Sequence, residues 1–254
     1  MFYKNDYSFG LKGINLYMLY GGTNWGNMGF AVGYTSYDYG AAIKEDRTLT
    51  REKYAELKLQ ANFFKVSPSW LIANPKNFTN RSEYANTDAI TVTALTTNKT
   101  SFWVIRHSNY SSFDSTDYQL TLPTTSGQVT IPQLGGVLSL HGRDSKIMVV
   151  DYLVGNYTIL YSTAEIFTWQ TQPGKIVLVA YAGPDETNEF AIKSNHGEKV
   201  RILEGALEAT ALLNDSTVVQ WRTNSQRAVF TFGALEVYLL GIDIFPFCHP
   251  ITGD

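Results

Sequence analysis

The sequence contains little cysteine, little histidine and no long hydrophobic run. Cys248 is the only cysteine among the 254 residues, which excludes an intrachain disulfide and a metal site built on thiolates. The four histidines are scattered without ligand spacing, so we expect no metal site. No apolar stretch reaches membrane-spanning length, and the first residues lack the basic and apolar regions of an export signal.

Charged residues are also scarce. They make up 17 % of the chain, and the formal net charge is −3. Because no run of Lys or Arg stands out, nothing attracts a phosphate backbone or an anionic membrane surface, and we predict neither a nucleic-acid partner nor a membrane partner. The sequence has no Gly-x-Ser-x-Gly elbow, and Gly135-Gly136 after Pro132 indicates a turn rather than a phosphate loop. We therefore expect no cofactor.

Aromatic residues and glycosylation sequons are abundant. Aromatics account for 14 % of the chain, with 16 Tyr, 14 Phe and 5 Trp, a composition that suits both a β-structured core and a sugar-binding cleft. The Asn-x-Ser/Thr sequons indicate an extracellular protein, and we give them more weight than the missing disulfides. They begin at Asn77, Asn80, Asn98, Asn109, Asn156 and Asn214.

The amino-terminal part has the pattern of one βα unit. Residues 11–19 are apolar and β-prone without alternation, which predicts a strand buried on both faces. Two glycine-containing loops follow, at residues 21–26 and 33–40. A helix is then predicted from an N-cap at Thr50 to Ser67-Pro68. Its apolar stripe comprises Tyr54, Leu57, Ala61 and Phe64.

Beyond residue 67, short β-prone runs alternate with turn signals. In residues 90–94 every second side chain is a threonine, which predicts one polar and one apolar face. We therefore predict an antiparallel β-rich, sandwich-like domain of layered sheets. The runs expected to form strands are residues 89–95, 102–106, 118–122, 137–140, 147–150, 157–161, 176–181, 189–192, 218–221 and 228–232.

Two strings give the chain a specific resemblance. Gly-Gly-Thr-Asn-Trp-Gly at residues 21–26 and Tyr-Thr-Ser-Tyr-Asp-Tyr at residues 34–39, followed by residues 50–54, resemble the end of the catalytic barrel in glycoside hydrolase family 35 β-galactosidases. The resemblance implies that residues 1–66 are the C-terminal βα part of a (β/α)₈ TIM barrel and that residues 67–240 are the family's second, antiparallel β domain. The tail, residues 241–254, resembles nothing recognisable. We expect a gene truncated or misjoined at both ends.

The resemblance also implies a function. Family members are secreted, retaining hydrolases of terminal β-D-galactosyl residues, and they use two glutamates about 5 Å apart. Both glutamates lie upstream of the matched part, so we assign no catalytic residue here and expect this chain alone to be inactive. Asp38, Glu45 and Asp46 lie near the loops, but loop acids usually just hydrogen-bond or face water.

Two tyrosines are the candidate sugar-binding residues. The tyrosines that approach galactose in the family correspond to Tyr17 and Tyr39, while Trp25 and Asn24 are weaker candidates that could serve only to shape the loop. A phenol offers an apolar face to sugar C–H groups and a hydroxyl for hydrogen bonding. The competing hypothesis is a noncatalytic β module that binds carbohydrate or supports a neighbouring domain. The β-rich share of the chain and the absence of an acid pair favour that hypothesis.

Overall fold

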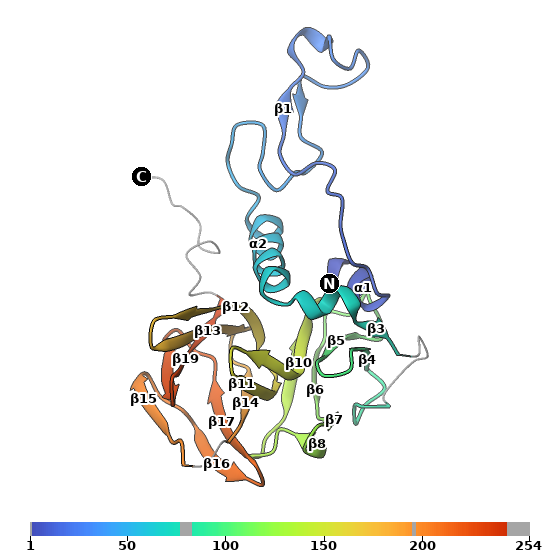
Figure 1. Cartoon of the computed structure of the whole chain (residues 1–254). Coiled ribbons are helices and arrows are strands. Elements are labelled where there is room, and N and C mark those ends of the chain that lie inside the picture. The colour runs from blue at the N-terminus through green and yellow to red at the C-terminus, as the bar shows by residue number, and fades with distance from the viewer. Residues whose placement is uncertain (1, 77–82, 195–196, 243–254) are drawn as a thin grey trace.

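The computed structural model describes residues 2–76, 83–194 and 197–242, and this part of the chain is mainly β-structure (Figure 1). An eight-stranded sheet has the order β16-β17-β14-β11-β10-β5-β4-β3, and all its neighbouring pairs are antiparallel. Its strands are β3 (Asn74–Pro75), β4 (Ile90–Thr96), β5 (Ser101–His107), β10 (Ser145–Val154), β11 (Tyr157–Ser162), β14 (Thr187–Lys193), β16 (Ala209–Leu213) and β17 (Ser216–Arg222).

A five-stranded sheet faces it, with the order β12-β13-β19-β18-β15. Its strands β13 and β19 are parallel, a departure from the antiparallel expectation. The long stretch of chain between them leaves room for the crossover that a parallel pair needs. The strands of this sheet are β12 (Glu165–Gln172), β13 (Lys175–Ala182), β15 (Val200–Glu204), β18 (Ala228–Phe232) and β19 (Leu235–Gly241).

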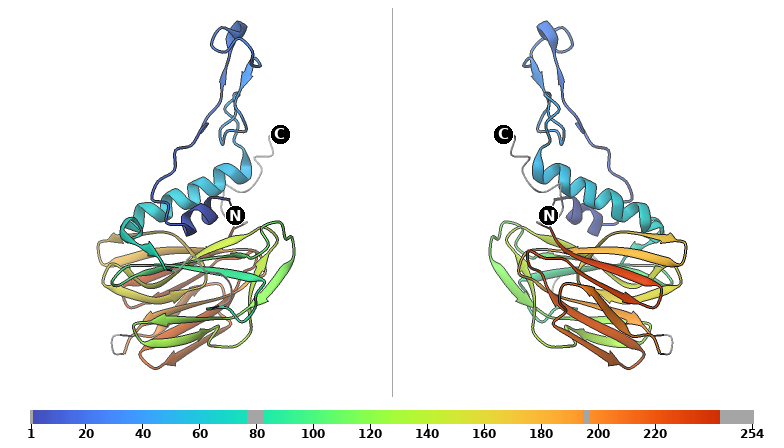
Figure 2. Two further views of the ribbon diagram at one scale, coloured as in Figure 1. Left: turned by 90° about the vertical axis from the view of Figure 1, so that its right-hand side faces the viewer. Right: turned by 90° about the vertical axis from the view of Figure 1, so that its left-hand side faces the viewer.

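Two small sheets cover the far side of the eight-stranded sheet, so the β part has three layers (Figure 2). They pair β6 (Ser115–Tyr118) with β9 (Leu138–His141), and β7 (Leu120–Thr124) with β8 (Gly127–Ile131). The expected single strand at residues 118–122 is therefore wrong. It is divided between β6 and β7, which pair with different partners.

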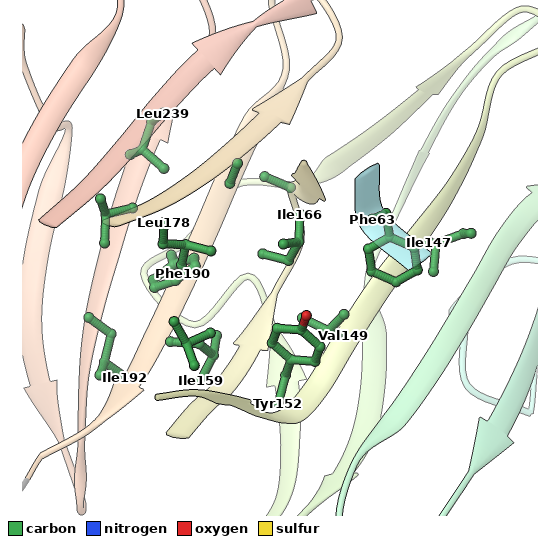
Figure 3. Close-up of a cluster of buried hydrophobic side chains, with 14 of the residues drawn as sticks. Phe63, Ile147, Val149, Tyr152, Ile159, Ile166, Leu178, Phe190, Ile192 and Leu239 are labelled. Atoms are coloured by element: carbon green, nitrogen blue, oxygen red, sulfur yellow. The ribbon is translucent and has the colours of Figure 1, made fainter. Parts of the chain in front are cut away.

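The main core lies between the two large sheets. Phe190, Ile159 and Val149 from one sheet belong to the same buried cluster as Leu178 and Leu239 from the other, and all of them are essentially excluded from solvent (Figure 3). A second buried cluster, which includes Ile90, Trp103 and Ile105, fills the opposite face of the eight-stranded sheet. Burying each such side chain contributes about 1.5–3 kcal/mol. Both faces of this sheet are thus covered, which is why Thr93 in β4 is buried rather than facing solvent as its alternation predicted.

The predicted helix is confirmed as α2 (Arg51–Val66), and a 3₁₀ turn, η2 (Pro68–Ile72), follows it. Thr50 is the N-cap residue, as predicted, although its hydroxyl donates to the Ala41 carbonyl oxygen (2.6 Å) and caps no helical N–H. The face packed on the β part carries Ala55, Leu59 and Phe63.

The apolar stripe that the sequence predicts for α2 faces a groove. Tyr54, Leu57, Ala61 and Phe64 line a mostly apolar groove of about 530 Å³ that also contacts the segment before the first loop. Phe64 of this stripe also packs against the main core, but most of the contact between the helix and the sheets comes from the adjacent positions Ala55, Leu59 and Phe63, at i, i+4 and i+8.

Residues 11–50 form an arm that extends away from the sheets (Figures 1 and 2). The buried strand predicted at residues 11–19 is absent, because a strand needs a paired neighbour. Among the described residues, the nearest pairing is a single bridge between Ile43 and Tyr20, just after this segment. Two short strands, β1 (Gly22–Thr23) and β2 (Ser36–Tyr37), pair within the arm, and η1 (Trp25–Asn27) lies near its tip.

The first helix, α1 (Phe2–Ser8), is fastened to the β part by a buried ion pair. Lys4 Nζ lies 2.8 Å from Glu165 Oε2 and 3.4 Å from Glu56 Oε1, and it donates to the Ser145 carbonyl oxygen (2.9 Å). Burial opposes the charge on Lys4, but attraction by Glu165 and Glu56 raises its pKa overall. The amino-terminal segment and the β part therefore share one polar anchor.

Candidate functional site

Three tyrosines meet in the arm, where β1 pairs with β2. The Tyr17 and Tyr37 hydroxyls are hydrogen-bonded to each other, and the Tyr37 ring meets the Tyr39 ring edge-on with centroids 5.0 Å apart. The Tyr17 and Tyr39 rings lie 6.3 Å apart and are tilted by 42°. We call this group the tyrosine cluster. It brings the two predicted sugar-binding residues together and adds Tyr37, which sequence reasoning missed.

The exposure of these rings favours ligand binding over a core role. Tyr17 is 74 % and Tyr39 is 63 % exposed, whereas Tyr37 is half-buried between them. The hydrogen bond between Tyr37 and Tyr17 is the main cause that raises the pKa of Tyr37. A signal for Tyr37 was present in the sequence, since it lies two residues from Tyr39 and positions i and i+2 share a face in extended chain.

Close backbone packing holds the cluster in place. A Cβ atom at Gly21 would lie 2.5 Å from Asp38 Cβ and 2.9 Å from Glu45 N, so only glycine fits there. Tyr39 has a φ of 44°, in the left-handed region, and the Gly40 N–H beyond it donates to Asp38 Oδ1 (3.2 Å). The Arg47 guanidinium donates to the Gly21 carbonyl oxygen (2.5 Å) and ties the later part of the arm to this turn.

Asn24 shapes the loop at the tip of the arm. Its buried amide donates to the carbonyl oxygens of Phe30 (2.9 Å) and Tyr34 (3.3 Å), and its Oδ1 accepts from the N–H groups of Gly29 (3.0 Å) and Phe30 (3.1 Å). All these bonds go to backbone, so Asn24 acts as a structural residue here. Trp25, in contrast, is 73 % exposed.

The carboxylates near the cluster are hydrogen-bonded locally. Glu45 Oε1 accepts from the Thr23 hydroxyl (2.5 Å), and bonds from Ser36 and Thr23 lower the Glu45 pKa. Asp46 accepts from the Thr48 hydroxyl (2.6 Å) and N–H (2.9 Å), and these bonds lower its pKa as well. A general acid in glycoside hydrolysis needs a raised pKa, so neither residue is suited to that role.

The described residues contain no group of three or more His, Cys, Asp or Glu side chains that could hold a metal ion. Within the same ranges, no helix has both the length and the apolar character needed to cross a membrane.

Comparison with known proteins identifies the family. Residues 1–64 match the model for glycosyl hydrolases family 35, and residues 72–243 match the model for β-galactosidase domain 2. The chain belongs to the family 35 β-galactosidases. It is 52 % identical over 245 residues to β-galactosidase A of a Penicillium species and 52 % identical over 243 residues to β-galactosidase A of Aspergillus niger. A probable β-galactosidase A of Neosartorya fischeri is 51 % identical over 243 residues.

Each of these alignments covers 94 % of this chain but only 24 % of the relative. The chain thus spans about a quarter of the length of the family 35 β-galactosidases it matches, and the tyrosine cluster lies inside the part that matches the family 35 model. The division between the two family models falls at residues 64–72, around the end of α2.

Proposed function

We propose that this chain is part of a retaining β-galactosidase that releases terminal, non-reducing β-D-galactosyl residues from extracellular carbohydrate. In this proposal residues 1–66 belong to a (β/α)₈ barrel and residues 67–240 form the second domain. Residues 241–254 are a tail, and of these residues 243–254 lie outside the described residues. The observation that carries the proposal is the meeting of Tyr17 and Tyr39 within the segment that matches family 35.

Tyr17 and Tyr39 are proposed to bind the galactosyl group. Their exposed rings provide apolar faces for sugar C–H groups, and their hydroxyls can hydrogen-bond to the ring hydroxyls of the sugar. Asn24 and Gly21 would hold the loops that carry these rings, as their contacts indicate.

The two catalytic glutamates are proposed to lie on barrel strands outside this chain. Retaining hydrolysis needs one carboxyl group as acid/base and a second as nucleophile. The lowered pKa values of Glu45 and Asp46 argue against their replacing that pair. We therefore expect no turnover from the chain alone.

Secretion and N-glycosylation form part of the same proposal. Four of the sequon asparagines, Asn98, Asn109, Asn156 and Asn214, are exposed and lie in loops or turns between strands. Such positions are accessible to a glycan. Asn77 and Asn80 lie outside the described residues.

The test compares two proteins: this chain, and the same chain extended upstream through the rest of the barrel. Each is assayed for hydrolysis of a chromogenic β-galactoside. We expect activity only in the extended protein, with a severe loss in its Tyr39→Phe variant and little change in Tyr34→Phe, because Tyr34 is an exposed tyrosine of the same arm. Turnover by the chain alone that Tyr39→Phe abolishes would show that the catalytic groups lie within it.

The second candidate function is a noncatalytic carbohydrate-binding β module. It is favoured by an aromatic-lined groove of about 790 Å³ on the β part, which includes Trp169. This function would be selected over the first by two results together. Both proteins would be inactive in the assay, and the chain alone would bind an oligosaccharide.

A further inference from the structure

A groove distinct from the tyrosine cluster lies at one end of the β part. Its walls are the end of α2 with η2, strand β3, the turn between β4 and β5, the end of β10, and Trp169 of β12. Its volume of about 790 Å³ falls within the range of about 300–1,000 Å³ that is typical of ligand pockets. We call it the β4–β5 groove.

Trp169 gives this groove an aromatic surface with a fixed orientation. Its indole N–H lies 3.1 Å from the Tyr152 hydroxyl and 3.2 Å from the Val66 carbonyl oxygen. The Tyr152 hydroxyl in turn donates to the Val66 carbonyl oxygen (3.0 Å). The polar edge of the indole is thus satisfied inside the protein, so what Trp169 can offer a ligand is carbon surface.

Polar side chains line the same groove, and they include Asn74, Lys76, Asn98 and Lys99. An apolar ring face bordered by amide and ammonium groups matches the two kinds of surface on a pyranose, its C–H face and its hydroxyls. The chemistry of the groove therefore fits a carbohydrate.

The groove also carries its own attachment point for a carbohydrate. Asn98 begins the sequon Asn98-Lys99-Thr100 and lines the groove. The Thr97 hydroxyl fixes this turn, since it accepts from the N–H groups of Lys99 (3.2 Å) and Thr100 (3.0 Å). The Asn98 side chain is exposed and has no hydrogen-bond partner among the residues that the structure describes.

We propose that an N-linked glycan on Asn98 occupies the β4–β5 groove, with its first N-acetylglucosamine residues against Trp169. This inference rests on the secretion that the proposed function includes. A glycan attached at Asn98 needs little affinity of its own, because attachment holds it at a high effective concentration beside the groove. The attachment point is also the reason to favour the chain's own glycan over a free oligosaccharide as the occupant.

Asn214 supplies a matched control. It lies in the turn between β16 and β17, it is exposed like Asn98, and neither it nor its chain neighbours line the groove. A glycan on Asn214 should therefore stay outside the β4–β5 groove.

The experiment produces this chain with an added export signal in a eukaryotic host that attaches high-mannose glycans. Glycopeptide mass spectrometry measures the occupancy of each sequon. An endoglycosidase that cleaves between the two core N-acetylglucosamines is then applied to the native and to the denatured protein. In the native protein we expect release at Asn98 to be about fivefold or more slower than at Asn214, as stacking of about 1 kcal/mol predicts, and equal rates after denaturation.

The second measurement replaces Trp169, which provides the aromatic surface of the groove. In Trp169→Leu, release at Asn98 should accelerate to the rate at Asn214, with the far-ultraviolet circular dichroism spectrum unchanged. Equal native rates at the two sites, or occupancy of Asn109, Asn156 and Asn214 without Asn98, would overturn the inference while leaving secretion intact. The absence of glycan at every sequon would instead contradict the secretion proposed for the parent protein.

Discussion

The hydroxyl of Tyr17 is hydrogen-bonded to the hydroxyl of Tyr37, although 20 residues separate them in the chain. The Tyr37 ring also meets the Tyr39 ring edge-on, so one side chain contacts both proposed sugar-binding tyrosines. The β1–β2 pairing fixes this relationship, because it places Tyr37 directly opposite Gly22. Tyr37 is therefore a candidate positioning residue that would act on the sugar through its two neighbours.

Tyr37→Phe tests that role in the protein extended through the barrel. It removes the bond to Tyr17 and keeps the ring against Tyr39, so we expect KM for a β-galactoside to rise about 2–10-fold, the net value of one hydrogen bond. Catalytic turnover should change much less. The double variant with Tyr17→Phe should raise KM by less than the product of the two single increases, because both variants remove the same Tyr17–Tyr37 bond. Fully additive losses, or no loss in Tyr37→Phe, would contradict the positioning role, and Tyr34→Phe is the matched control.

A second prediction concerns the anchor of α1. Lys4→Met leaves Glu165 buried without its cation, and we expect the free energy of unfolding to fall by about 3–5 kcal/mol. The double variant Lys4→Met with Glu165→Leu should recover much of that loss, because it removes both charges. Urea denaturation measures both variants, with Lys44→Met on the exposed arm as control. A loss in the double variant as large as the sum of the two single losses would show that the pair is not coupled.

The sequence predicted local structure well where short-range signals suffice. The helix ended at Ser67-Pro68 as expected, and most β-prone runs became strands. Segments whose partners lie far along the chain were less predictable. The parallel pairing of β13 with β19 depends on the fold as a whole, and β12 is polar in its second half, so it carries little strand signal.

At residues 11–19 the prediction was wrong in the opposite way, because the sequence signals a strand that does not form. It is apolar and β-prone, yet it forms no strand because the described residues provide no neighbouring strand along its length. Propensity states which conformations a segment tolerates, whereas a strand requires a paired edge. The same limit applies to the site. Tyr17 and Tyr39 could be selected by resemblance, but the bond between Tyr17 and Tyr37 depends on how the two halves of the arm are paired.

A third prediction concerns Glu189, a fully buried carboxylate that orders the loop after β8. It accepts from the N–H groups of Gln133 (2.7 Å) and Leu134 (2.7 Å), the Tyr161 hydroxyl (2.9 Å) and the Gln220 amide (3.2 Å). In Glu189→Gln, an NH₂ group must face a donor, and we expect a loss of about 1–3 kcal/mol in the free energy of unfolding. The exposed Glu208→Gln is the control, and equal denaturation midpoints for the two variants would refute the prediction.

The last prediction concerns stability at high pH. Burial, with negative charge at Glu186 and Glu165, raises the pKa of Tyr118 well above its usual value, and burial raises the pKa of Tyr7 to about 12. A raised folded-state pKa means that the folded protein holds the phenol proton more tightly than the unfolded chain does. The stability from these groups is therefore complete below about pH 10, the unfolded value, and is lost as the pH rises toward the folded values.

Tyr118→Phe separates this effect from general alkaline damage. The Tyr118 hydroxyl is buried and has no hydrogen-bond partner among the described residues, so its removal should leave stability at pH 7 unchanged or slightly higher. It should also flatten the decline in the free energy of unfolding between pH 10 and pH 12, because one linked proton is gone. Tyr110→Phe, an exposed position, should leave that slope as it is. Parallel declines in wild type and Tyr118→Phe, measured by urea denaturation at each pH, would mean that Tyr118 ionises with an ordinary pKa in the folded protein.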